Sequence, residues 1–132
     1  MKTSRILLVF FFLFAACVEQ EPARTDENLF RNLSMGVWEV SFFERSGSIQ
    51  TDLFQGISFI FYPNGISEAY RGTRLLDQGT WRTFVDSKNI KLELTFSNLQ
   101  DLNGDWYQDF VRDSQITIRR ESMNSLLVFE KI

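Results

Sequence analysis

The segment Ile90-Lys91-Leu92-Glu93-Leu94-Thr95-Phe96 carries the clearest secondary-structure signal in the chain. Its apolar residues alternate strictly with polar ones, so an extended backbone would present one apolar face and one polar face. An amphipathic helix would instead repeat every 3.6 residues. The segment therefore predicts a β-strand with one face in a hydrophobic core and the other in water.

Further segments on both sides carry the same strand signals, either period-two alternation or enrichment in β-branched and aromatic residues. They are residues 38–42, 54–62, 66–70, 79–85, 106–112, 115–119 and 126–130. Asn64-Gly65, between two of them, is a strong signal for a tight hairpin. Short connections of this kind predict an all-β fold, an antiparallel up-and-down meander of about eight strands that closes into a small barrel. A two-sheet β-sandwich is the alternative, which periodicity does not separate from the barrel.

A short helix is expected to precede the strands. Leu29, Phe30 and Leu33 are spaced to share one helical face, and Thr25 or Asp26 could cap the helix. A helix of one to two turns is unstable alone, so we expect it to dock on the barrel.

The N-terminal residues have the order of a secretory signal. Lys2 and Arg5 precede the apolar run 6–14, which is shorter than the roughly 20 residues that span a bilayer. The run ends in Leu13-Phe14-Ala15-Ala16-Cys17, which resembles the lipobox of bacterial lipoproteins. This resemblance implies a lipoprotein signal peptide at 1–16 and lipidation with palmitate or a similar acyl chain at Cys17. The polar, acidic composition after the cysteine predicts a flexible tether at 17–28, and the helix and strand signals predict a barrel domain at 29–132.

The resemblance to lipoproteins also implies a cellular location. Val18 follows the cysteine, where lipoproteins retained in the inner membrane are expected to carry Asp. We therefore expect an outer-membrane lipoprotein of the cell envelope, on the periplasmic face or the cell surface.

Four short motifs in the predicted barrel domain resemble sequence motifs of lipocalins and lipocalin-like lipoproteins. Gly36-Val37-Trp38 is similar to the Gly-x-Trp signature of lipocalins. Residues 59–65, Gly79-Thr80-Trp81 and residues 127–132 are similar to segments of short bacterial lipocalin-like lipoproteins. The resemblance implies a lipocalin-like barrel in which Trp38 packs at the closed end under an arginine, either Arg112 or Arg119.

Composition excludes several kinds of chemistry. The chain has 17 acidic and 14 basic residues, so it has no basic footprint for nucleic acid. It has no histidine and a single cysteine, which removes the usual general base and the usual zinc ligands. We predict that the protein is not an enzyme and has no cofactor.

Two groups of acidic residues are interpreted as structural. Asp101-x-Asn103-x-Asp105 follows the start of a calcium-loop pattern, but Trp106 and Arg112 stand where that loop needs Gly and Glu. It is predicted to be a polar turn, not a metal site. Other carboxylates are predicted to lie on solvated strand faces, since nothing in their spacing places two across a cleft; these are Glu39, Glu68, Glu93 and Asp105.

Apolar side chains on the inner face of the barrel are the candidate lining of a ligand cavity. They are Trp38, Val40, Phe59, Phe61, Trp81, Leu92 and Leu94. The leading hypothesis is a membrane-anchored binding module that sequesters or carries a small apolar or amphiphilic ligand. An eight-stranded barrel is wide enough either to hold one small ligand or to be filled by side chains.

The alternative hypothesis is a protein-binding scaffold with a packed core, either an inhibitor or an accessory subunit of an envelope complex. Its contacts would come from the loops around Gly47 and from Asp101 to Asp105.

Overall fold

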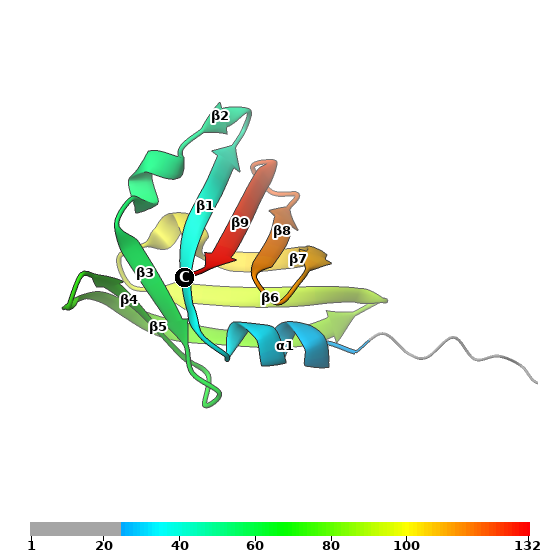
Figure 1. Cartoon of the computed structure of the whole chain (residues 1–132). Coiled ribbons are helices and arrows are strands. Elements are labelled where there is room, and N and C mark those ends of the chain that lie inside the picture. The colour runs from blue at the N-terminus through cyan, green and yellow to red at the C-terminus, as the bar shows by residue number, and fades with distance from the viewer. Residues whose placement is uncertain (1–24) are drawn as a thin grey trace, which may run out of the picture.

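The computed structural model describes residues 25–132, which form a closed antiparallel β-barrel (Figure 1). The predicted signal peptide, Cys17 and most of the predicted tether lie outside the described residues. Within residues 25–132 no helix is long and apolar enough to cross a membrane.

The barrel consists of one sheet that closes on itself. Its elements are α1 (Glu27–Leu33), β1 (Val37–Arg45), β2 (Ser48–Ile49), the 3₁₀ helix η1 (Thr51–Phe54), β3 (Ile57–Phe61), β4 (Ile66–Arg71), β5 (Arg74–Asp86), β6 (Asn89–Phe96), the 3₁₀ helix η2 (Gln100–Leu102), β7 (Gly104–Val111), β8 (Gln115–Arg120) and β9 (Ser125–Lys131). From β3 to β9 each strand pairs with the next strand in the sequence, and β1 pairs with both β3 and β9. These pairings confirm the eight-stranded barrel and exclude the two-sheet alternative. The short β2 is an extra strand paired to β1.

Tight turns and short helices set the strand boundaries. The Asn64-Gly65 hairpin joins β3 to β4 as predicted, with Gly65 at φ 88°. The prediction that a strand begins at residue 54 is wrong, because η1 buries Phe54 and Gly56 turns the chain at φ 74° before β3. β5 begins at Arg74, five residues earlier than predicted.

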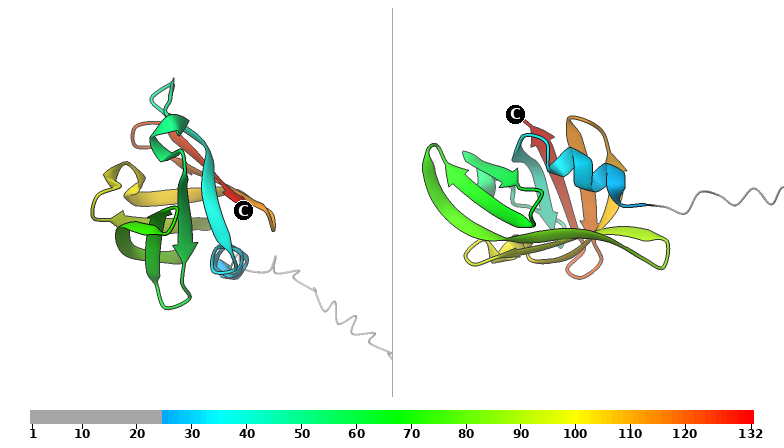
Figure 2. Two further views of the ribbon diagram at one scale, coloured as in Figure 1. Left: turned by 60° about the vertical axis from the view of Figure 1, so that its left-hand side comes forward. Right: turned by 90° about the horizontal axis from the view of Figure 1, so that it is seen from below.

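Helix α1 lies across the end of the barrel where β1 begins and β9 ends (Figures 1 and 2). Leu29 and Leu33 are fully buried in the core, as the spacing predicts. Phe30 is 37% exposed and stacks on Trp81 with ring centroids 5.1 Å apart. Asp26 is the N-cap residue but does not cap with its side chain; its carboxylate accepts a hydrogen bond from Thr83 Oγ1 at 2.6 Å. The helix is therefore held by its packing on the barrel.

The opposite end is covered by the two 3₁₀ helices. η1 contributes the buried Phe54 and η2 the buried Leu102, which belong to the same core as the strand residues. The barrel strands, helix α1, the two 3₁₀ helices and the buried hydrophobic cluster all lie between Glu27 and Lys131. A chain that starts at residue 25 thus contains a complete folding unit with its own core.

Candidate functional site

The residues nominated as a cavity lining are all buried, with exposed fractions between 0% and 7%. Their aromatic rings contact one another across the barrel. The ring centroid of Phe59 lies 5.9 Å from that of Phe96 and 5.6 Å from that of Phe129. Phe61 lies 5.6 Å from Trp81 and 5.5 Å from Phe129 in edge-on arrangements. Such pairs are typical of a well-packed interior, so these side chains form the central layer of the core.

Small residues on the inner faces of β4 and β5 complement these large rings. Ala69 and Ser67 are fully buried, and a Cβ at Gly79 would collide with the backbone of Thr95. The Ser67 hydroxyl has no hydrogen-bond partner among the described residues. The small inward residues of β4 and β5 thus leave room for the large aromatic rings, and the Ser67 hydroxyl is buried among the core side chains.

Trp38 closes the α1 end of the barrel. Its indole Nε1 donates to the carbonyl oxygen of Leu33 at 3.1 Å, which ties the strand to the last residue of α1. The resemblance implied an arginine over this ring, but the cation above it is Lys131, whose Nζ lies 6.0 Å from the ring centroid.

Neither arginine nominated for this position reaches Trp38. Arg119 points outward and pairs with Asp109 at 2.9 Å, since alternation along β8 places Ile116 and Ile118 inward. Arg112 lies in the turn after β7 and stacks over Phe110 at 4.5 Å. The expectation for Arg112 and Arg119 is therefore wrong.

Trp106 closes the opposite end of the barrel with the same kind of hydrogen bond that Trp38 forms at the α1 end. Trp106 Nε1 donates to the carbonyl oxygen of Leu102, the last residue of η2, at 2.8 Å. The guanidinium of Arg120 lies 4.3 Å from the Trp106 ring and is only 5% exposed. It donates to the carbonyl oxygens of Asn103 at 2.6 Å and Asp101 at 3.2 Å. Burial lowers the pKa of Arg120, and the nearby Arg45 lowers it further.

Arg120 was not singled out from the sequence, although a signal was present. It continues the inward alternation of Ile116 and Ile118 along β8. A cation at an inward position near a strand end requires carbonyl or aromatic partners, and η2 and Trp106 supply both.

Hydrogen bonds and one ion pair organise the polar loop at residues 101–105. Asp101 forms an ion pair with Arg45. The Asn103 side chain accepts from the backbone N–H of Phe96 at 2.6 Å and donates to the carbonyl oxygen of Phe96 at 2.9 Å. In the described part of the chain no group of three or more Cys, Asp or Glu residues could hold a metal ion.

Glu68 and Glu93, two of the carboxylates predicted to lie on outer strand faces, each have a local partner. Glu93 pairs with Arg82 at 2.9 Å, and this hydrogen bond lowers the pKa of the Glu93 carboxyl. Glu68 accepts a hydrogen bond from the Tyr70 hydroxyl at 2.8 Å, which is the main reason that the pKa of Tyr70 rises to about 12. These contacts stabilise the outer surface and do not assemble an acid–base pair.

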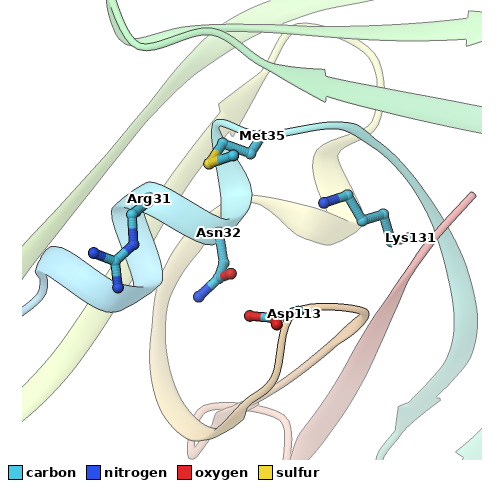
Figure 3. Close-up of a pocket in the computed structure, with 5 residues that line it drawn as sticks. All are labelled: Arg31, Asn32, Met35, Asp113 and Lys131. Carbon is cyan, nitrogen blue, oxygen red and sulfur yellow. The ribbon is translucent and has the colours of Figure 1, made fainter.

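A surface pocket of about 360 Å³ lies beside α1 (Figure 3). We call it the α1 pocket; its lining is Arg31, Asn32, Met35, Asp113 and Lys131. The first two residues belong to α1 and Met35 to the turn after it, whereas Asp113 comes from the β7–β8 turn and Lys131 from the end of β9. A volume of this size is within the range of small-molecule sites.

Three of the five side chains that line the α1 pocket are charged. Arg31, Lys131 and Asp113 form no ion pair with any other described residue, whereas four ion pairs form elsewhere in that part of the chain. The Lys131 stem runs over Gly36, where a Cβ would collide with it. Two cations and one carboxylate thus surround a space that also touches the thioether of Met35.

Sequence patterns could not identify the α1 pocket. Its residues come from three segments that meet only when β9 closes the barrel against β1 and the β7–β8 turn reaches the same end.

These features define the class of the protein: a closed, up-and-down, lipocalin-like β-barrel with a helix across one end and a polar pocket beside that helix. The chain is similar in structure to a DUF4847 family protein from Bacteroides vulgatus, with a TM-score of 0.56 and 13% sequence identity over 77% of this chain and 96% of that chain. It is also similar to an uncharacterized protein from Bacteroides eggerthii, with a TM-score of 0.52 and 12% identity over 75% of this chain and 99% of the other. At such low identity the likeness establishes the fold alone. No protein-family model and no curated protein matches the sequence.

Proposed function

We propose that the protein is a lipid-anchored binding module that sequesters or carries a small amphiphilic molecule with an acidic group, without covalent chemistry. The observation that carries this proposal is the pair of cations in the α1 pocket, Arg31 and Lys131, which form no ion pair within the described residues. Arg31 donates only a 3.4 Å hydrogen bond to the neutral Asn28 side chain, and Lys131 lies over the Trp38 ring. Cations without a carboxylate partner beside a preformed concavity are suited to an anionic ligand.

The side chains that line the α1 pocket restrict the chemical class of the ligand. The planar guanidinium of Arg31 can bind a carboxylate or phosphate through two hydrogen bonds, and Lys131 adds a point charge. Met35 offers a polarizable apolar contact for a short hydrocarbon segment. Asp113 would repel a second negative charge and accept a hydrogen bond, which favours a monoanion with a hydroxyl or amide.

The experiment that tests this proposal is a titration of residues 25–132 with decanoate, followed by the indole N–H resonance of Trp38, which lies beneath Lys131. Decyltrimethylammonium, with the opposite charge, is the ligand control. We expect saturable binding of decanoate and a weakening of about tenfold or more in Lys131→Gln, because a charged hydrogen bond contributes on the order of 1.5 kcal/mol or more. Arg74→Gln, an exposed cation in another hairpin, is the matched control. Equal binding of both amphiphiles, or none, would refute the proposal.

The anchor is part of the proposal and has its own test. Residues 13–17 support acylation of Cys17 and an outer-membrane address, on the periplasmic face or at the cell surface. Labelling with a palmitate analogue in a bacterial host should mark the wild-type chain and not Cys17→Ser. Label retained in Cys17→Ser would show that the cysteine is not the acylated residue.

A specific observation also favours the protein-binding alternative. At the end opposite α1, Ile49 is 68% exposed, Leu53 53% and Met123 50%. The β1–β2 and β8–β9 turns meet there, since Ser46 N–H donates to the Met123 carbonyl oxygen at 3.0 Å. If a partner binds this end, site-specific crosslinking from position 49 in intact cells would capture one protein, and Met123→Ser would reduce the yield.

A further inference from the structure

Exposed apolar side chains gather beside the α1 pocket. Met35 is 58% exposed, Val37 36% and Ile132 71%. Ile132 N–H donates to the carbonyl oxygen of Val37 at 2.8 Å, so the residue after β9 lies beside the first residue of β1. We call these three residues the apolar rim. They adjoin Lys131, so apolar and cationic groups share one end of the barrel.

This combination has the chemistry of a membrane interface. Exposed apolar side chains can enter the boundary between headgroups and acyl chains, while adjacent lysine and arginine side chains attract anionic headgroups. Lys131 is suited to this position, because its stem covers Gly36 and its ammonium remains exposed. The positive charge is local, since the whole chain has a net charge of −3.

Chain length determines which end of the barrel can reach the bilayer. Helix α1 begins at Glu27, ten residues after Cys17. At about 3.3–3.6 Å per residue, ten residues span at most roughly 35 Å. The chain enters the barrel at the α1 end, so this end is the one tethered nearest to an anchored cysteine (Figure 1).

We propose that the α1 end is a membrane-contact surface, with the apolar rim in the bilayer interface and the α1 pocket facing anionic phospholipid headgroups. This inference rests on the proposed function, because it names the source of the amphiphile: the module takes its ligand from the bilayer to which it is anchored. Aqueous amphiphiles released by other proteins are the competing source.

Vesicle binding of the unanchored chain, residues 25–132, tests the inference. Binding is compared between vesicles of phosphatidylcholine alone and vesicles of phosphatidylcholine mixed with phosphatidylglycerol. We expect stronger binding to the anionic vesicles, and less binding at high salt because of screening. Lys131→Gln should weaken it about fivefold, the usual contribution of one cation near an anionic surface. Met35→Ser should weaken binding to both kinds of vesicle.

The β4–β5 hairpin provides a matched control, because Arg74 and Leu75 are an exposed cation and an exposed apolar residue away from α1. Arg74→Gln and Leu75→Ser should leave vesicle binding unchanged. No binding to anionic vesicles, or the same loss from the control variants, overturns the inference. If the chain binds decanoate but not vesicles, the inference fails while the proposed function stands. If the chain binds anionic vesicles but not decanoate, the α1 end is a membrane-contact surface and the proposed ligand site is refuted.

Discussion

Replacing Phe59 with alanine measures how fully side chains fill the barrel. Phe59 is completely buried, with ring centroids 5.6 Å from Phe129, 5.9 Å from Phe96 and 6.5 Å from both Phe54 and Phe61. Loss of its burial alone costs about 1.5–3 kcal/mol. In a packed core the surrounding rings cannot collapse into the vacated space, and the total for such a truncation rises to about 3–5 kcal/mol.

Urea denaturation of residues 25–132, followed by tryptophan fluorescence and far-UV circular dichroism, gives this free energy. Coincident transitions and an unchanged m-value are needed for a two-state comparison. Phe110→Ala is the control, because Phe110 is 40% exposed on the outer face, and it should cost less than about 1 kcal/mol. A cost below about 2 kcal/mol for Phe59→Ala would refute the argument, because the side chain would then line open space rather than fill a core.

Three further predictions concern the walls and ends of the barrel. Gly79→Ala should destabilise the fold by at least about 1–3 kcal/mol in thermal melts, because the added methyl would collide with the facing backbone of β6. Glu68→Gln should lower the pKa of Tyr70 from about 12 toward 10.0 in an alkaline phenol titration. Since folding raises this pKa, the associated stability is complete below pH 10.0 and is lost as the pH rises toward 12. Arg120→Gln should cost about 1.5–3 kcal/mol in urea denaturation, because it removes charged hydrogen bonds to buried carbonyls, whereas the exposed Arg119→Gln should cost less than about 1 kcal/mol.

Local patterns predicted the strands whose side chains alternate regularly. β6 spans Asn89–Phe96, one residue more than the predicted segment, and its apolar side chains at 92, 94 and 96 point inward. The short helix was also predictable, since Leu29 and Leu33 are spaced to share a face and both are buried. These features depend on neighbours within a few residues, which a single sequence contains.

The first part of β5 was not predictable for a physical reason. A bulge between Ala69 and Tyr70 shifts the register, so that Leu75 and Leu76 do not alternate and Asp77 points inward. Asp77 is only 4% exposed, and its carboxylate accepts hydrogen bonds from the backbone N–H groups of Asn98 and Leu99 at 2.8 Å. These partners are more than twenty residues away, so the buried charge is satisfied by tertiary structure that the local sequence does not encode.

The cations above the two end tryptophans differ in how far they are already engaged, which supports the α1 end as the proposed binding site. Each indole donates to the last carbonyl of a short helix and lies below a cation. At the η2 end the cation, Arg120, is 5% exposed and its terminal nitrogens are bound to backbone carbonyls, so it has little capacity left for a ligand. At the α1 end the cation is Lys131, which is exposed, lies farther from its ring and has no ion-pair partner within residues 25–132. The same arrangement of indole, helix carbonyl and cation thus occurs at both ends, but the Arg120 guanidinium is engaged at the η2 end, whereas the Lys131 ammonium is available at the α1 end. Because aromatic rings contact one another across the interior between them, the proposed ligand is expected to bind at the surface of the α1 end, outside the packed core.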